Sequence, residues 1–361
     1  MRHGLPSRVF ARGRSPRVVP RRRRGGRMTT TSETPAGFEP LLRVSGLRTW
    51  YAIRQGLLRK TVGHVQAATD VGFEIAPGET LALVGESGCG KSTVGRSILR
   101  LESPQEGEVV FEGKDLLSLD EAALRLARQR VQIVFQDPMA SLDPRMRIRD
   151  QIAEGMQSFG IGADEKERTE RVASLLARVQ LDPAAMDRYP HEFSGGQRQR
   201  ICIARALAVE PRLIVCDESV SALDVSIQAQ ILNLLRELQD ELGLSYLFIT
   251  HDLSVVKYLA HQVAVMYLGE IVEQGPTDRI FEAPAHPYTQ GLLAAIPSID
   301  PDRRGGSPPV LGDVPSPSDP PAGCHFHTRC NRVMDRCRAE APPLVPLEGG
   351  ASRCFLSSGE G

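Results

Sequence analysis

The sequence predicts an α/β fold built around a parallel sheet. Short apolar runs, of the kind that form strands buried on both faces, recur along the chain with helical patterns between most of them. One of these runs, at 81–84, leads directly into a glycine-rich segment and then into a helical pattern. Alternation of buried strands and helices is typical of α/β proteins.

The expected elements follow in order along the chain. A short alternating strand comes first, then a basic loop, and the later strands are mostly apolar runs: 42–47, 71–75, 81–84, 131–135, 213–216, 246–249 and 263–267. Helical spacing is found at 93–100, 166–179 and 197–207. No strand pattern occurs from about 141 to 208, which predicts a mainly helical subdomain there. After Pro284 proline, glycine and cysteine become frequent, which indicates a small loop-dominated unit.

Charge is unevenly spread along the 361 residues, although 44 basic residues balance 44 acidic ones. Ten arginines and no acid precede Met28, so the rest of the chain is mildly acidic and gives no support to nucleic-acid binding. Three interpretations of this arginine-rich head are a solvated tail, an arm for nucleic acid or a membrane surface, and upstream sequence translated in error before Met28. We expect residues 1–40 to be disordered and without a folded role.

Two kinds of membrane segment are not expected. A secretory signal needs an apolar stretch of about 7 to 15 residues after its positive charges, and none follows the arginines. No window approaches the ~18 to 20 apolar residues of a membrane-spanning helix. Any connection to a membrane is therefore expected to pass through partner proteins.

The glycine-rich segment fits the phosphate-binding pattern G-x-x-x-x-G-K-[ST] between a buried strand and a helix. In such a loop backbone N–H groups converge on phosphates at a helix N-terminus, the lysine reaches the terminal phosphates and the hydroxyl after it ligates Mg²⁺. The residues are Gly85, Glu86, Ser87, Gly88, Cys89, Gly90, Lys91, Ser92 and Thr93. The loop predicts a purine triphosphate ligand without choosing between ATP and GTP.

Acidic and imidazole side chains follow two of the later strands. Asp217 and Glu218 end the apolar run at 213–216, and His251 comes directly after the strand expected at 246–250. The carboxyl ends of parallel strands share one edge of a sheet, so these side chains are expected beside the phosphate-binding loop. There Asp217 could hold Mg²⁺ through water, Glu218 could polarise the attacking water, and His251 could contact the γ-phosphate.

A second anion-binding helix N-terminus is expected at Ser194, Gly195, Gly196 and Gln197, where a serine and two glycines open the helical pattern at 197–207. Alone this string is an ordinary helix cap. Together with the phosphate-binding loop before it and the acidic strand end after it, this string is close to diagnostic of one protein family.

These segments resemble, in the family's order, the motifs of ABC ATPases. The matches are Walker A (85–93), the Q-loop (Gln136), the signature (194–197), Walker B (217–218), the D-loop (221–224) and the switch histidine (His251). The resemblance implies a P-loop ABC ATPase core with a RecA-like body and mixed sheet, an antiparallel β subdomain and a helical subdomain. It also implies two subunits that sandwich two ATP molecules, each between the Walker A of one subunit and the signature of the other.

The same resemblance implies residue roles. Mg²⁺ is expected at Ser92, Gln136 and Asp217, and catalytic roles are expected for Lys91, Gln136, Glu218 and His251. Asp224 belongs to the implied nucleotide-binding set. Tyr51, or its neighbour Trp50, resembles the upstream aromatic residue that stacks on adenine, which favours ATP. The alternative is that this aromatic residue has only an ordinary packing role in the core.

Longer segments resemble the oligopeptide/dipeptide importer branch of that family, and the likeness covers about residues 40–356. They are 136–146, 189–201, 221–226, 286–289 and 323–330. The branch implies uptake of oligopeptides or dipeptides by a peripheral subunit at the cytoplasmic face of the cell membrane. Its implied partners are a second ATPase subunit, identical or a paralogue, two transmembrane permease subunits and an extracytoplasmic peptide-binding protein, with no nucleic acid. Phe193 stands where many ABC proteins have leucine, and Ser219 stands where many members of this branch have proline. Neither departure changes the acidic pair, Asp217 and Glu218.

Other functions stay open at this point. Another cargo such as nickel, a soluble ABC ATPase and a regulatory subunit with a dead site are the alternatives. Ribosomal ABC ATPases carry two complete motif sets in one chain, and chromosomal ones have a very long coiled coil between Walker A and the signature. This chain has one motif set and only about a hundred residues between Walker A and the signature, which argues against both. The intact Asp217, Glu218 and His251 argue against a dead site.

The C-terminal tail holds four of the seven cysteines, at Cys324, Cys330, Cys337 and Cys354. Their number suits a 4Fe-4S cluster or a zinc ion, although the gaps exceed those common in zinc fingers, and free thiols are the third interpretation. Disulfides are disfavoured if the chain faces the cytosol. The importer branch carries the same four cysteines, which implies the cluster.

The chain is expected to divide into three parts. They are a disordered N-terminal extension at 1–40, the ATPase domain at 41–285 with its helical part at 141–208, and the cysteine-bearing C-terminal domain at 286–361.

Overall fold

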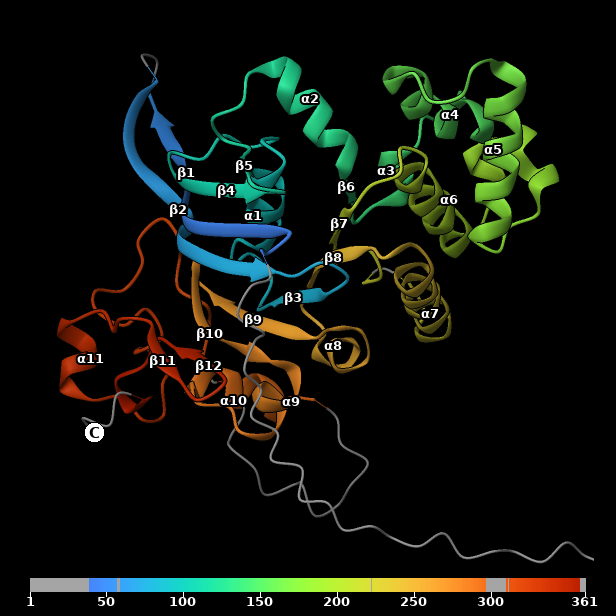
Figure 1. Ribbon diagram of the computed structural model, residues 1–361. Helices are drawn as coiled ribbons and strands as arrows, with labels where there is room; N and C mark the ends of the chain where they lie inside the picture. The colour runs from blue at the N-terminus through green and yellow to red at the C-terminus, as the bar shows by residue number, and fades with distance from the viewer. Residues whose placement is uncertain (1–38, 57–58, 222, 297–309, 311, 358–361) are drawn as a thin grey trace, which may run out of the picture. The chain divides into compact units, whose positions relative to one another are not determined.

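The computed structural model describes residues 39–56, 59–221, 223–296, 310 and 312–357. The arginine-rich head, expected to be disordered, lies outside these residues except for its last two positions. Within the described residues the strands form two sheets, which Figure 1 shows together with the helices around them.

The larger sheet has the order β11-β12-β10-β9-β3-β8-β7-β6, and its members from β9 to β6 run parallel. Its strands are β3 (Thr80–Val84), β6 (Val131–Val134), β7 (Leu213–Asp217), β8 (Ser245–Thr250), β9 (Gln262–Tyr267), β10 (Glu270–Pro276), β11 (Val345–Leu347) and β12 (Gly350–Ser352). The parallel strands match the apolar runs of the sequence, and every residue of β3, β7 and β8 is buried. The α/β prediction is confirmed.

Alternate residues of these strands belong to opposite layers, as the pleat requires. In β7, Leu213 and Val215 pack in the cluster that also contains α1 and the smaller sheet, whereas Ile214 and Cys216 pack against the helices of the other face. The strand is buried on both faces, which explains its continuous apolar sequence.

The smaller, antiparallel sheet has the order β2-β1-β4-β5. Its strands are β1 (Leu42–Gln55), β2 (Lys60–Ile75), β4 (Glu106–Phe111) and β5 (Lys114–Asp115). The basic loop expected between 47 and 71 was wrong, because β1 and β2 continue through it as a long hairpin with pairs such as Trp50 and Gln66. The outer part of this hairpin is largely exposed and polar, so the sequence carries no buried face to reveal it.

The helices fill the connections between strands. They are α1 (Lys91–Ile98), α2 (Glu121–Arg130), α3 (Pro138–Ser141), α4 (Ile148–Phe159), α5 (Glu165–Arg178), α6 (Gly195–Leu207), α7 (Val225–Leu242), α8 (Leu253–Leu259), α9 (Thr277–Glu282), α10 (Pro287–Ala294) and α11 (Asp335–Ala339), with 3₁₀ helices η1 (Pro183–Asp187), η2 (Pro190–Glu192) and η4 (Phe355–Ser357). Residues 141–208 hold α4 to α6 and no strand, as expected, and Figure 1 shows α4 and α5 beside α6. Of the helices that the described ranges contain, none is both long and apolar enough to cross a membrane.

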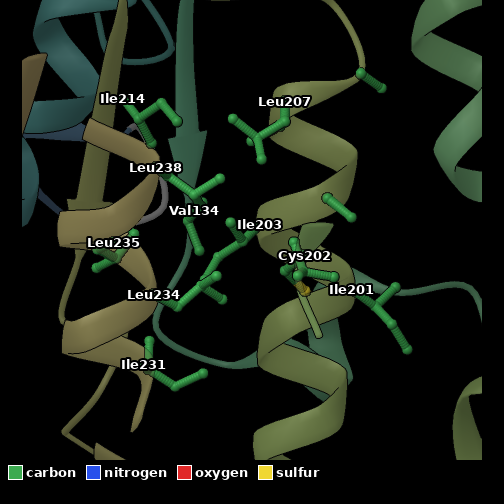
Figure 2. Packing of buried hydrophobic residues seen from close by; sticks show 14 of the residues in the cluster. Val134, Ile201, Cys202, Ile203, Leu207, Ile214, Ile231, Leu234, Leu235 and Leu238 are labelled. Atoms are coloured by element: carbon green, nitrogen blue, oxygen red, sulfur yellow. The ribbon is translucent and has the colours of Figure 1, made fainter. Parts of the chain in front are cut away.

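Helices α6 and α7 pack together over the sheet. Figure 2 shows Ile203 of α6 near Leu234 and Leu238 of α7, with Val134 of β6 beside them, whereas Ile201 points away from α7. Burial of each large aliphatic side chain contributes about 1.5–3 kcal/mol relative to its exposure. This apolar contact fixes α6, whose N-terminus carries the serine-glycine segment, against the body of the protein.

The C-terminal segment, which begins at residue 286, is joined to the larger sheet rather than lying apart from it. Strand β12 pairs antiparallel with β10, through Glu273 with Ser352 and Gln274 with Ala351. Phe326 is 3% exposed and packs at ring-centroid distances of 5.3 and 5.4 Å from Tyr267 and Tyr288. The segment is mostly loop, as expected, but it covers an edge of the sheet that would otherwise present unpaired backbone groups.

Candidate functional site

The phosphate-binding loop lies between β3 and α1, in the context that the sequence predicts. Gly90 is the N-cap of α1 and has φ +108°, a conformation that side chains disfavour. A Cβ atom there would stand 1.7 Å from the Ala67 carbonyl oxygen, and one on Gly85 would stand 2.2 Å from the carbonyl oxygen of Met266. The backbone of the loop is therefore packed against the middle of β2 and the end of β9.

Lys91 is 3% exposed and lies inside this loop. Its Nζ donates to the carbonyl oxygens of Gly85 at 2.8 Å and Glu86 at 2.9 Å, and it lies 3.8 Å from Glu218 Oε1. A buried ammonium needs such partners, because burial removes its hydration. The loop thus holds a positive charge beside the carboxyl ends of the parallel strands.

Ser92 and Asp217 form a close pair across two elements. Ser92 Oγ, in the first turn of α1, donates to Asp217 Oδ1 at 2.6 Å, and Asp217 ends β7 with 2% exposure. Burial raises the pKa of Asp217, and the hydrogen bond from Ser92 opposes that rise. Arg96 NH2 lies 3.7 Å from Oδ2 of the same carboxylate. A hydroxyl and a carboxylate are oxygen donors of the kind that suit Mg²⁺.

The Glu218 carboxylate contacts side chains from two neighbouring strand ends and from the phosphate-binding loop. Its Oε2 accepts from Gln136 Nε2 at 2.9 Å, and its Oε1 lies 3.5 Å from His251 Nδ1 and 3.8 Å from Lys91 Nζ. Gln136 follows β6, Glu218 follows β7 and His251 follows β8. Glu218 has φ +46°, a strained backbone conformation for a non-glycine residue and one that is common at functional sites.

A cleft of about 340 Å³ runs along these residues, within the size range of ligand pockets. Its lining comprises Tyr51, Val65, Ala67, Ser87, Gly88, Gly90, Lys91, Ser92, Thr93, Gln136, Glu218 and Pro317. Tyr51 is 37% exposed and its hydroxyl lies 3.5 Å from Thr93 Oγ1. Trp50 Nε1 instead donates to Thr69 Oγ1 at 2.9 Å. Adjacent residues of a strand point to opposite faces, which favours Tyr51 over Trp50 as the aromatic residue at this cleft.

The serine-glycine segment does not line this cleft. Ser194 is the N-cap of α6 in a capping box, in which its Oγ accepts from Gln197 N at 3.4 Å and its own N–H donates to Gln197 Oε1 at 2.9 Å. Gly196 lies against α7, because a Cβ atom there would stand 2.4 Å from Ile227 Cγ2. Asp224 is the N-cap of α7 without a side-chain cap bond, and Ala222 lies outside the described residues. The structure therefore does not bring Ser194 to Gln197 or Asp224 together with the loop.

The four C-terminal cysteines line one small cavity together with His286, Phe326 and Phe355. Burial, followed by the influence of the other three cysteines, raises the pKa of Cys324 to about 12. Burial also lowers the pKa of His286 to about 3, so that imidazole is neutral. Over the described ranges, no group of three or more His, Cys, Asp or Glu residues is arranged to hold a metal ion.

Three contributors to the cleft were missed at the level of sequence: Val65, Ala67 and Pro317. Pro317 belongs to a proline-rich segment far from every nucleotide motif, and no sequence signal links it to the loop. The alternation of β2 could have suggested Val65 and Ala67, had the hairpin been recognised.

Comparison with known proteins identifies the family. The family model described as ABC transporter matches residues 68–221, and the one described as the C-terminal region of oligopeptide/dipeptide transporters matches residues 272–337. A relative from Sinorhizobium fredii, described as a probable peptide ABC transporter ATP-binding protein (y4tS), is 51% identical over 88% of this chain and 90% of its own length. The chain belongs to the ABC transporter ATP-binding proteins. Its C-terminal match places it in their oligopeptide/dipeptide branch.

Further relatives agree with this ABC assignment. The oligopeptide transport ATP-binding protein AppF of Bacillus subtilis is 49% identical, covering 86% of this chain and 94% of that one. The dipeptide transport ATP-binding protein DppF of Haemophilus influenzae is 48% identical, covering 88% and 96%. As a member of this family the chain is an ATPase that binds ATP and Mg²⁺, and such subunits act in pairs with membrane permeases.

Solved structures of ABC cassettes share the fold. A dimeric post-hydrolysis state of the cassette MJ0796 bound to ADP and Pi has a TM-score of 0.58 at 28% identity, covering 65% of this chain and 98% of that one. The cbiO1 protein of Clostridium perfringens, part of the complex cbiONQ, has a TM-score of 0.58 at 28% identity, covering 68% and 91%. The ABC ATPase core expected from the motifs is thereby confirmed.

Proposed function

We propose that this ABC ATPase works at the cytoplasmic face of the cell membrane and powers the uptake of oligopeptides or dipeptides. The observation that carries the catalytic part is the grouping of Gln136, His251 and Lys91 around the Glu218 carboxylate, at 2.9, 3.5 and 3.8 Å. The cargo is supported by the names of relatives near 50% identity and by the match of the C-terminal region.

In the proposed mechanism the side chains act on the phosphates, on the attacking water and on the metal ion. Lys91 offsets the charge of the terminal phosphates, and Glu218 orients the attacking water, with Gln136 and His251 holding its carboxylate. Ser92, Asp217 and Gln136 would hold Mg²⁺, which when bound would supply positive charge beside the phosphate oxygens. Tyr51 stacks on adenine. A positioned general base of this kind contributes about 10²–10⁴-fold to a rate.

A partner subunit completes each ATP site in this proposal. Ser194, Gly195 and Gly196 lie at the N-terminus of α6, away from the cleft of their own chain, and a helix N-terminus attracts phosphate. Gln197 and Asp224 act beside them at the paired surface. The partner is a second ATPase subunit, identical or a paralogue, and the pair is bound to two transmembrane permeases fed by an extracytoplasmic peptide-binding protein.

Uptake measurements test the cargo. In cells that lack this gene, uptake of a labelled dipeptide and of a labelled tetrapeptide should fall and should recover with the wild-type chain. The same cells are assayed for nickel uptake as the alternative cargo. Unchanged peptide uptake together with a loss of nickel uptake would overturn the peptide assignment while leaving the ATPase assignment intact.

The C-terminal cysteines form the second part of the proposal. Cys324, Cys330, Cys337 and Cys354 hold a 4Fe-4S cluster, a role supported by their number and by the single cavity that they line. Iron and acid-labile sulfide assays with an absorption spectrum of anaerobically purified protein test this. Four iron atoms per chain support the cluster, whereas one zinc per chain, or four titratable thiols without metal, overturns it.

The proposed domain boundaries follow this division of labour. The ATPase domain spans residues 41–285, with its helical subdomain at about 141–208, and residues 286–361 form the cysteine-bearing unit. Limited proteolysis of the intact chain tests the later boundary, because a cut near residue 286 should leave an ATPase-sized fragment.

A further inference from the structure

The C-terminal segment grips the phosphate-binding loop at Glu86. The guanidinium of Arg329 donates through NH1 to Glu86 Oε2 at 2.6 Å and through NH2 to Oε1 at 2.9 Å. The Arg329 side chain is 5% exposed and that of Glu86 is 28% exposed. Two parallel bonds between a guanidinium and a carboxylate restrict orientation as well as distance, and shielding from water strengthens them.

A second contact from the same part of the chain reaches the backbone of Glu86. The Tyr288 hydroxyl, near the start of α10, accepts from the Glu86 N–H at 3.0 Å, and Tyr288 is completely buried. Its ring lies 4.7 Å from that of Tyr267 and 5.4 Å from that of Phe326, measured between centroids. The Arg329 guanidinium stands 5.7 Å from the centre of the Tyr267 ring. This aromatic packing fixes both groups that hold Glu86.

Glu86 also contacts the lysine of the loop, Lys91. Its carbonyl oxygen accepts from Lys91 Nζ at 2.9 Å, while its N–H and carboxylate are held by Tyr288 and Arg329. Every polar group of this residue therefore contacts either the C-terminal segment or Lys91. Pro317 of the same segment also accepts from Gln66 N at 2.9 Å and lines the cleft. The segment thus lines the cleft at Pro317 and contacts the phosphate-binding loop at Glu86.

We propose that Arg329 and Tyr288 are positioning residues for nucleotide binding, which act through Glu86 on the loop and on Lys91. The nucleotide site is then built from both parts of the chain, and the C-terminal segment is one of its walls. This inference rests on the proposed ATP site. Arg329 would act indirectly: by orienting the loop through Glu86, it would change the free energy of phosphate binding without contacting the phosphate.

The test is a double-mutant cycle read by nucleotide affinity. Kd for a fluorescent MgATP analogue is measured on the purified full chain for the wild type, Arg329→Met, Glu86→Gln and the double variant. Arg329→Met should raise Kd at least fivefold, and it should have little further effect once Glu86→Gln is present, because contacting residues couple. Additive effects in the double variant would overturn the route through Glu86. An unchanged Kd for Arg329→Met would overturn the positioning role itself.

Controls separate positioning from folding. Arg338→Met changes an exposed arginine of the same segment and should leave Kd within twofold of the wild type. Tyr288→Phe keeps the ring and removes only the hydroxyl acceptor, and it should raise Kd with little loss of thermal stability. If Arg329→Met fails to fold, Arg329→Lys and Tyr288→Phe decide, and wild-type affinity in both overturns the proposal. A wild-type chain that binds no MgATP would instead refute the ATP site on which the inference depends.

Kinetics give a second readout. KM for ATP in Arg329→Met should rise by a factor similar to that of Kd, whereas kcat should change less, because the arginine does not touch the reacting atoms. A fall in kcat with an unchanged KM contradicts the assignment and points to a general loss of structure.

Discussion

At the scale of single residues, Glu218 is the side chain on which the site converges. Its carboxylate is 12% exposed, contacts Gln136 and His251 at two other strand ends and Lys91 at the start of α1, and sits on a strained backbone with φ +46°. Strain of this kind costs of order 1–3 kcal/mol and persists where the surroundings hold the residue in place. The carboxylate is thus kept in one position beside the cleft, which suits a group that must orient a water molecule.

Replacing that carboxylate by an amide should separate binding from turnover. Glu218→Gln keeps the shape and the contact with Gln136 but removes the charge, so we expect ATP hydrolysis to fall at least ~10²-fold. ATP binding should persist, and an ATP-bound dimer should accumulate. Turnover by phosphate release, Kd for MgATP and mass by light scattering measure the three effects. Glu121→Gln, on the exposed side of α2, is the control, and wild-type turnover in Glu218→Gln would remove the role assigned here.

The choice between two adjacent aromatic residues gives another prediction at this scale. Tyr51 lines the cleft, whereas the Trp50 indole is bonded to Thr69. Tyr51→Ala should therefore raise Kd for ATP about tenfold through the loss of stacking, and Tyr51→Phe should not. Titration of both variants with a fluorescent ATP analogue measures this. A larger loss in Trp50→Phe than in Tyr51→Ala would reverse the assignment.

Site residues that form short contiguous motifs could be predicted from the sequence, because a single loop or strand end carries each of them. The sequence left Trp50 and Tyr51 open, since only the pairing of β1 with β2 decides which face meets the cleft. Pro317 and Arg329 could not be predicted, because their place depends on how distant parts of the chain fold together.

At the scale of elements, α7 is joined to the strands beneath it by Gln239, which is 7% exposed. Its Nε2, which carries two hydrogens, lies 3.0 Å from the Gly78 carbonyl oxygen, 3.0 Å from the Thr80 hydroxyl and 3.1 Å from the Leu244 carbonyl oxygen. One amide thus satisfies buried acceptors at the start of β3 and before β8, next to the strand that leads into the phosphate-binding loop.

Removing that amide should destabilise the whole protein. Gln239→Leu leaves these buried acceptors unpaired, and each costs about 1–3 kcal/mol, so we expect a loss of several kcal/mol in the free energy of unfolding. Denaturant unfolding followed by circular dichroism measures it. Gln228→Leu, in the first turn of the same helix and only half-buried, should cost less than about 1 kcal/mol. Equal losses in the two variants would show that the buried contacts of Gln239 are unimportant.

Elements with a strong pattern were predicted closely, and those without one were not. Strand β7 and helix α5 follow their apolar runs within one residue, because burial of β7 and the buried side of α5 force the pattern. Helix α6 begins at Gly195 rather than 197, since the capping box starts it at Ser194. Strands β4, β5, β10, β11 and β12 were missed, because most of them are short or partly exposed and gain their pairing from other segments.

At the scale of the whole molecule, the C-terminal segment and the phosphate-binding loop should respond to nucleotide together. Coupling between two sites is reciprocal, so a ligand that orders the loop also stabilises contacts behind it. We expect MgATP to slow amide hydrogen exchange in residues 85–91 and also in residues 323–330. Mass spectrometry of peptides from these segments, with α5 as a reference that should not change, measures the effect. Protection confined to the loop would count against the coupling.

The order of strands in the larger sheet affects how this protein is made. Strand β3, which leads into the phosphate-binding loop, is paired on both sides with β8 and β9, which the ribosome synthesises much later. At roughly 5–20 residues per second, its apolar residues wait on the order of ten seconds or more for those partners. During that interval the nascent segment is a target for chaperones and for aggregation, and slower translation just before β8 would lower the yield of native protein.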